Sequence, residues 1–537
     1  MRHMEEYPVK GEKLFRALGQ LDDDIVQEAE EQRSFPRTLP WKKYGAAAAA
    51  AVLLLSVALL PGTGWWKDIS GSLQPQSGGM ESIPEYDAGA GGSGHEEGST
   101  FMSYAGPVFP MTLQEGEEIP ADREVRYSFT AEENGYSENG SVWGAEVSDT
   151  YVLYNHTLED RVVTALYPFA GSFRELEKER PRVSLDGSTV ETVLYAGGYS
   201  GGYMGVWGGE DMDTGSSNLA MPDSWESYRD LLQDGSYRGQ ALSSKVKLDQ
   251  AVTVYDFTSS SADLETYPAA TQSISFMIDP GETQILTYGW EGMEWDEKSG
   301  FRRYSYFVPD GITNVTRSKL LIVLGDDIGD YELQGYRNGG CADGEEIDGV
   351  TCEITRYETD LGTVVSRLLK EFLDQYMPEV AQAAEEGGSV TLEMLEQAVS
   401  VLVYQDGILS EDVKERYAEG RLEDILSEAV TVDRVFYLAY DLTIPADSQI
   451  EVQVGQWKAP SYDFACSGSE NTGIQGYDCL TKLDSSLQFG SVKASLENTG
   501  KVEIVRQNFG FDLDRGVNSV ELDPGQERYY LEIKAKE

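Results

Sequence analysis

The chain has 537 residues, enough for several domains, and 42 Lys and Arg against 93 Asp and Glu give it a net charge of −51. Such an acidic chain repels nucleic acid and anionic lipid, which argues against direct nucleic-acid binding. The only histidines, His3, His95 and His156, leave little scope for histidine-based catalysis or metal binding. A solvated, highly charged surface is the simplest interpretation, and attraction of cations or basic polymers is the alternative.

The first predicted element is an amphipathic helix in a cytoplasmic segment, residues 1–40. Its apolar residues recur at helical spacing and form one narrow stripe: Leu14, Leu18, Leu21 and Ile25. A single helix of about 20 residues cannot bury such a stripe. The stripe therefore predicts a partner, either a second copy or another cytoplasmic protein. The acidic polar face disfavours the membrane surface in that role.

Residues 41–66 predict a transmembrane helix. The uncharged run from Gly45 to Leu60 spans about 24 Å as a helix, and Tyr44 to Trp66 spans about 34 Å, against a hydrocarbon core of ~30 Å. Basic residues cluster before the segment, which predicts a single-pass cell-membrane protein with a cytoplasmic N-terminus and an extracytoplasmic C-terminal region. A cleaved signal peptide is the alternative, although its n-region would be unusually long and no A-x-A-like site follows.

Residues 67–105 are rich in Gly and Ser and predict a flexible tether. Apolar alternation then predicts a β-rich exported domain or domains over 106–358, with Ile274 and Phe276 on one face of a strand. The same alternation predicts a C-terminal β-sandwich-like domain over 431–537. The exported region is therefore expected to be mainly β.

A weak internal repeat supports β-sandwich-like modules. Ile119-Pro-Ala-Asp and Ile444-Pro-Ala-Asp precede similar strand-like runs. Asp279-Pro-Gly and Asp523-Pro-Gly each stand between two such runs and predict tight turns. Four related strand–turn–strand units favour two or more sandwiches.

Residues 359–430 interrupt the β pattern and predict an inserted segment of about three helices. The first has apolar residues at helical spacing and ends before Pro378. Thr391 is expected to cap the second helix, and Ser410 to open the third. We expect the segment to pack against a sandwich or to separate two of them.

All four cysteines lie in the predicted exported part, where disulfides persist. Their spacing makes Cys341–Cys352 and Cys466–Cys479 the simplest of three connectivities, each contributing ~2–3 kcal/mol. Four free thiols are the alternative. The spacing does not suit a zinc site.

Catalytic motifs are weak. Ser200 lies in a G-x-S-x-G pattern, but no helical pattern and no histidine follow it. Residues 211–215 carry only part of a Ca²⁺-loop ligand run, so no cofactor is predicted, with Ca²⁺ as the alternative. We expect no enzyme, with a glycan hydrolase as the alternative because two carboxylates suffice for it. Trp290 and Trp295 are candidate ligand-binding aromatics; burial in a strand-pair core is the favoured alternative.

The N-terminal run LFRALGQLDDDIVQEAEE, followed by basic residues and an Ala-rich anchor, resembles single-pass anti-sigma-factor-like regulatory membrane proteins of Gram-positive-type bacteria. The resemblance covers about 65 residues. It implies that the cytoplasmic helix contacts an extracytoplasmic-function sigma factor while the exported region senses the envelope. The H-x3-C-x2-C motif of the zinc-containing branch is absent, since no cysteine precedes Cys341.

The sequence thus predicts a membrane protein whose acidic β-rich exterior binds or senses an extracellular ligand that the sequence does not name. Its cytoplasmic helix would contact a partner. The alternative is an envelope-anchored surface binding or adhesion protein, with a glycan or protein ligand and no regulatory role.

Overall fold

The computed structural model describes residues 104–536, apart from 115–117, 138–139, 199–221, 223, 243–245, 297, 309–317, 386–389, 406, 411–419, 465–470, 472 and 484–486. This part of the chain is mainly β, as the sequence predicted, with 48% strand; it also contains seven α-helices. The predicted cytoplasmic helix, the transmembrane helix and nearly all of the tether lie outside the described residues. Within the described residues, no helix combines the length and apolar character needed to cross a membrane.

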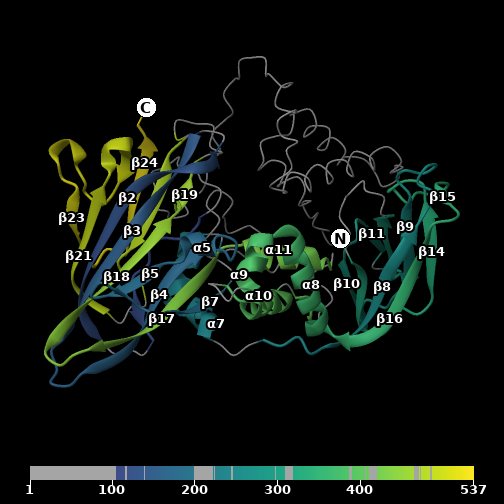
Figure 1. Cartoon of the computed structure of the whole chain (residues 1–537), viewed down its shortest axis with the longest axis horizontal. Helices are drawn as coiled ribbons and strands as arrows, with labels where there is room; N and C mark the ends of the chain where they lie inside the picture. The colour runs from purple at the N-terminus through teal and green to yellow at the C-terminus, as the bar shows by residue number, and fades with distance from the viewer. Residues whose placement is uncertain are drawn as a thin grey trace, which may run out of the picture. The chain divides into compact units, whose positions relative to one another are not determined.

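Two stretches far apart in the sequence build the largest sheet. Its seven strands are, in spatial order, β23 (Ser519–Leu522), β21 (Leu487–Glu497), β2 (Ile119–Ser137), β3 (Gly140–Asn155), β18 (Ser448–Lys458), β5 (Arg182–Leu185) and β6 (Ser188–Thr189). The parallel pair β2–β21 and the antiparallel pair β3–β18 join the two stretches. Figure 1 shows this as blue strands beside yellow and green ones. The predicted C-terminal domain over 431–537 is therefore not a separate unit.

Two four-stranded sheets share core clusters with this large sheet. One has the order β1 (Thr112–Leu113), β4 (Arg161–Gly171), β17 (Arg434–Ile444), β7 (Val193–Ala196); the other has β19 (Tyr462–Asp463), β20 (Gln475–Leu480), β24 (Arg528–Ala535), β22 (Val502–Gln507). Along β2, Ile119 and Ala121 belong to the core with the first sheet, whereas Val125 and Tyr127 belong to the core with the second. We call the three sheets together the composite sandwich.

The outer face of the β4–β17 sheet is covered by two short helices, α6 (Trp225–Gln233) and α7 (Ser236–Leu242). Because β17 has core contacts on both faces, Phe436 and Leu438 join one cluster while Val435 and Tyr437 join the other. The alternation predicted for this strand therefore underestimates its burial, since most of β17 lies inside the molecule.

A second sandwich is inserted between the two halves of the first. One sheet is β10 (Thr283–Tyr288), β13 (Lys319–Gly325), β8 (Ala251–Ser261), β16 (Thr351–Asp360); the other is β11 (Gly292–Asp296), β12 (Phe301–Phe307), β9 (Thr271–Met277), β14 (Tyr331–Tyr336), β15 (Glu346–Ile347). We call residues 251–360 the inserted sandwich. Ile274 and Phe276 of β9 lie in its core, as their alternation predicted.

Four helices follow the inserted sandwich: α8 (Leu361–Tyr376), α9 (Pro378–Glu385), α10 (Leu392–Gln405) and α11 (Leu422–Thr431). Asp360 caps α8, and Thr391 Oγ1 accepts a hydrogen bond from Met394 N at 3.2 Å, as expected of the second predicted helix. The sequence predicted about three helices; Pro378 ends α8 as expected but also opens α9, because proline suits the first helical turn.

The helix α11 is fastened to both sandwiches. At its start, Thr287 N of the inserted sandwich donates to Gly420 O at 2.7 Å, and Gly289 N donates to the Glu423 carboxylate. At its end, Arg174 N of the composite sandwich donates to Val430 O at 3.1 Å. One continuous core cluster contains residues of both sandwiches and of α8, α10 and α11. A ten-residue helix therefore joins the two by direct contacts.

Both predicted tight turns are present in the structure. The predicted internal repeat, however, does not correspond to a repeated local structure at its two Ile-Pro-Ala-Asp sequences. Gly281 N donates to Asp279 Oδ1 at 2.9 Å, and Gly525 N donates to Asp523 Oδ1 at 2.8 Å, so both Asp-Pro-Gly sequences make the same Asx turn. The two Ile-Pro-Ala-Asp sequences differ, because residues 119–122 lie inside β2 whereas 445–447 connect β17 and β18.

Candidate functional site

The first ten described residues cross the interior of the composite sandwich, and we call them the entry segment (residues 104–113). Val108 N donates to Asp478 O at 2.8 Å, and Leu480 N donates to Val108 O at 3.0 Å. The end of the segment, β1, pairs with β4. The entry segment thus bonds to both four-stranded sheets and closes the boundary between them.

Tyr104, at the start of the entry segment, is fully buried. Its hydroxyl donates to Asp478 Oδ2 at 2.6 Å, and its ring is stacked with that of Tyr462. Arg528 pairs with the same Asp478 carboxylate. The chain that arrives from the predicted tether is therefore held by aromatic packing and by a charged group from its first described residue onward.

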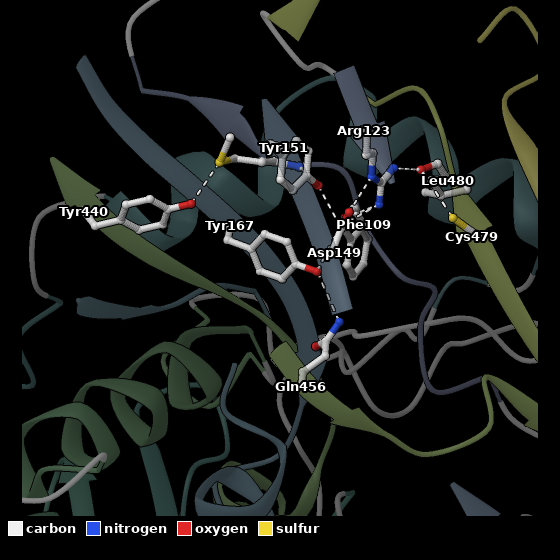
Figure 2. Close-up of polar contacts among 10 residues, drawn as sticks. Phe109, Arg123, Asp149, Tyr151, Tyr167, Tyr440, Gln456, Cys479 and Leu480 are labelled. Carbon is white, nitrogen blue, oxygen red and sulfur yellow. Dashed lines mark hydrogen bonds and ion pairs between the residues drawn. The ribbon is translucent and has the colours of Figure 1, made fainter. Parts of the chain in front are cut away.

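A fully buried ion pair lies where the cores with the two four-stranded sheets meet. Arg123 Nε and Nη2 donate to the two oxygens of Asp149, each at 2.8 Å, and neither side chain is exposed. Arg123 Nη1 also donates to Leu480 O at 2.5 Å, and Nη2 donates to Phe109 O at 3.0 Å. Figure 2 shows the guanidinium between these acceptors. One side chain thus connects β2, β3, β20 and the entry segment.

Tyrosines extend this ion pair into a network (Figure 2). Tyr151 OH donates to Asp149 Oδ2 at 2.7 Å, and Tyr167 OH donates to the same oxygen at 3.3 Å. Burial raises the pKa of both tyrosines, so they stay neutral donors. Burial by itself lowers the pKa of Arg123, but Asp149, Tyr151 and Cys479 together outweigh it and raise that pKa above its ordinary value. The guanidinium therefore stays protonated.

The network ends at a small polar cavity. Gln456 Nε2 donates to Tyr167 OH at 3.2 Å and also lines the cavity. The cavity measures about 30 Å³, and its wall consists of Ala105, Ala170, Gly171, Glu179, Asp433, Gln456, Trp457, Lys458 and Ala459. That volume holds about two water molecules. The entry segment, β4, β17 and β18 all meet at this point.

Three charged side chains face the cavity. Burial raises the pKa of Glu179 to about 7, with Lys458 opposing and Asp433 adding to the shift. Burial likewise raises the pKa of Asp433 and lowers that of Lys458. The Lys458 ammonium donates to Ala105 O of the entry segment at 3.0 Å. Of the three, Glu179 can bind and release a proton near neutral pH.

A glycine makes room for the Glu179 carboxylate. Glu179 ends the short helix α5 (Leu176–Glu179), whose Leu176 is buried in the core. A Cβ added to Gly171 would lie 2.7 Å from Glu179 Oε2, closer than real Cβ contacts. A side chain at this position of β4 would therefore displace the tip of the Glu179 side chain. For metals, no group of three or more His, Cys, Asp or Glu side chains that could hold an ion occurs among the described residues.

The predicted aromatic pair does not form one platform. Trp290 is 5% exposed, and its Nε1 donates to Leu320 O at 2.8 Å inside the aromatic core of the inserted sandwich. Trp295 lies on the edge strand β11 and is 41% exposed. Trp290 is therefore a core residue, as the favoured alternative expected, and Trp295 stays a candidate ligand contact.

The structure also departs from one predicted disulfide. Cys341 and Cys352 are free thiols, and they contact Ser305 and Tyr306, respectively. Consecutive residues of a strand point to opposite faces, so the two thiols lie on opposite faces of the sheet that contains β12. Cys479 is a buried free thiol, and its predicted partner Cys466 lies outside the described residues.

The stripe of Leu14, Leu18, Leu21 and Ile25 also lies outside the described residues. Sequence analysis missed the buried charges, although one signal was present. Arg123 occupies an inward position in the alternation of β2, which is otherwise apolar there. A charged residue at such a position predicts a buried partner.

The chain matches no protein-family model and no curated protein. The function is therefore argued from the geometry of these residues.

Proposed function

We propose that this chain is a single-pass membrane protein whose β-rich part senses a ligand or condition outside the cytoplasm. A change in the conformation of this β-rich part would be transmitted to a cytoplasmic helix that contacts a partner. The resemblance of the N-terminal sequence points to a sigma factor as that partner. Catalysis plays no part in this proposal.

The position of the entry segment is the observation that supports the proposal most. The chain between a membrane anchor and a passive domain needs only a loose surface attachment. Here the corresponding residues instead bond to two sheets and accept a hydrogen bond from the buried Arg123. A rearrangement of the composite sandwich therefore acts directly on the chain that leads towards the predicted anchor.

The contacts of α11 offer a route from the inserted sandwich to the same place. The helix begins at hydrogen bonds to Thr287 and Gly289, and two residues after its end lies Asp433, which lines the cavity. Arg434 Nη2 donates to Ala429 O at 2.9 Å and fixes this end of the helix. Asp433 and Lys458 line the same cavity, so a shift of α11 would change the position of Asp433 relative to Lys458. Lys458 in turn donates a hydrogen bond to the entry segment.

An epistasis experiment tests the proposal. In the full-length protein, Leu18→Glu places a charge on the predicted stripe and should release the cytoplasmic partner and change transcription, whereas Gln20→Glu, off the stripe, should do neither. Tyr104→Ala should also change transcription, but not when Leu18→Glu is present. If affinity purification of the full-length chain recovers no partner that Leu18→Glu releases, the regulatory role is wrong.

Surface adhesion is the second candidate, and the edge of the inserted sandwich favours it. Trp295 and Tyr331, each 41% exposed, lie at the two ends of a cross-strand row whose residue Phe276 is buried in the core, so each presents a separate exposed ring. Aromatic rings at a surface are suited to stacking on sugars. Trp295→Ala should then weaken sedimentation with insoluble peptidoglycan, with Leu158→Ala, exposed elsewhere, as the control. Under adhesion alone, deletion of residues 1–66 leaves binding and transcription unchanged.

A further inference from the structure

Three features of the cavity beside the entry segment allow a change of charge there to alter how the entry segment is held. Its volume of about 30 Å³ holds about two water molecules. The Glu179 carboxylate lies against Gly171 with no room to retreat on that side. The Lys458 ammonium facing the same space donates to Ala105 O.

We propose that Glu179 is the proton-binding group of a latch on the entry segment, which is tight when its carboxyl group is protonated and looser when it is ionised. The latch is a property of the folded protein, and its use in signalling rests on the function proposed above.

Competition for Lys458 explains the direction. When Glu179 is neutral, the ammonium is free to hold Ala105 O. When Glu179 is ionised, its carboxylate competes for the same ammonium and weakens that hold. The charged groups around Glu179 are Lys458 from β18, Asp433 before β17, and Glu175 and Lys178 from its own helix.

These neighbours favour protonation near neutral pH. Burial comes first in raising the pKa of Glu179 to about 7, and Asp433 and Glu175 add to the shift, while Lys458 and Lys178 oppose it. Asp433 faces Arg434 as well, and Lys458 also faces Asp478. Changes of pH between 5.5 and 8 would therefore switch the charge of this cavity.

Amide hydrogen exchange of the full chain in detergent, read by mass spectrometry and corrected for intrinsic rates, tests the latch. Peptides covering residues 104–113 should lose protection by about tenfold between pH 5.5 and 8. Glu179→Gln, which mimics the protonated state, should keep protection high at both pH values. Glu177→Gln, on the exposed side of the same helix, should behave like the natural protein.

Two further measurements distinguish a failed latch from an unfolded variant and from a failure of the proposed function. Peptides of the inserted sandwich report whether each variant is folded, and Asp433→Asn should move the midpoint of the loss to lower pH because it removes a neighbouring negative charge. Protection at 104–113 that does not change with pH, or that changes equally in Glu179→Gln, overturns the latch. A working latch without any effect on transcription would leave it standing and contradict the proposed function instead.

Discussion

The two sandwiches of this protein differ in where they place their charges. In the composite sandwich, Arg123 and Asp149 are completely buried, and Asp478 and Glu532 are buried with arginine partners. The core of the inserted sandwich consists of aromatic and aliphatic side chains. Its ion pairs are more exposed: Arg356 and Asp327 are 45% and 37% exposed, and Glu291, which pairs with the buried Lys319, is 33% exposed.

The difference follows from how each sandwich is assembled. The inserted sandwich comes from one continuous stretch of chain, whereas the composite sandwich joins strands separated by more than 300 positions and admits the entry segment into its middle. A buried charge with several exact acceptors favours one arrangement of such segments over others, although it adds little net stability. The polar interior is therefore where the segments meet.

The largest expected effect comes from breaking the buried pair. Arg123→Leu leaves Asp149 charged and without its ion-pair partner, and should lower the free energy of unfolding of the composite sandwich by about 3–5 kcal/mol in urea denaturation. Arg356→Leu, the surface counterpart, should have a far smaller effect, because water screens an exposed ion pair. Arg123→Met together with Asp149→Leu should recover most of the loss. Equal losses of stability in Arg123→Leu and Arg356→Leu would contradict the proposed difference between the two sandwiches.

The aromatic core of the inserted sandwich gives the next effect. Trp290→Phe removes the donor to Leu320 O and leaves part of the core unfilled, which should cost about 1–3 kcal/mol in thermal unfolding. Trp295→Phe at the exposed edge should change stability by less than about 0.5 kcal/mol. Similar effects of the two substitutions would show that Trp290 is not a core residue.

A smaller effect depends on pH. Because the pKa of Glu179 is raised to about 7 in the folded protein, its contribution to stability is complete below its ordinary pKa and is lost as pH rises through about 7. We expect the free energy of unfolding to fall by about 1–2 kcal/mol between pH 5.5 and 8. This is less than the full pKa shift implies, because the side chain is only partly buried. Glu179→Gln and Gly171→Ala, which expels the carboxylate, should both flatten the profile. If the dependence of stability on pH is unchanged in both variants, Glu179 is not its cause.

The smallest effect concerns the thiols. Cys341 and Cys352 lie on opposite faces of a sheet, so a reducing agent should change the stability of the inserted sandwich by less than about 0.5 kcal/mol. A disulfide across this loop would contribute ~2–3 kcal/mol. Quantifying free thiols in the denatured, unreduced protein checks the same point, and a missing pair of thiols at these positions would restore the disulfide.

The sequence indicated the local structure well. Alternation located β9, the stripe of α8 ended at Pro378 as expected, and both Asp-Pro-Gly sequences form turns, because each depends on neighbours within a few residues. The pairing of β2 with β21 could not be predicted in this way, since alternation shows which face of a strand is buried but not which strand lies beside it.

The candidate site was mostly out of reach for the same reason. Glu179 is surrounded by groups from three separate stretches of chain, and its shifted pKa arises only when these meet. Trp290 and Trp295 are five positions apart, yet one is a core residue and the other lies on an exposed edge. Only Arg123 carried a usable signal, as a charge within an otherwise apolar inward alternation.

The central claim is that α11 couples the inserted sandwich to the entry segment, and hydrogen exchange in a Glu423→Ala variant tests it most directly. This substitution removes the acceptor of Gly289 N at the far end of α11 from the cavity. We predict that residues 104–113 lose roughly three- to tenfold in protection, and that Ser427→Ala, within the same helix, leaves them unchanged. Faster exchange at 287–289 with unchanged protection at 104–113 would contradict the account.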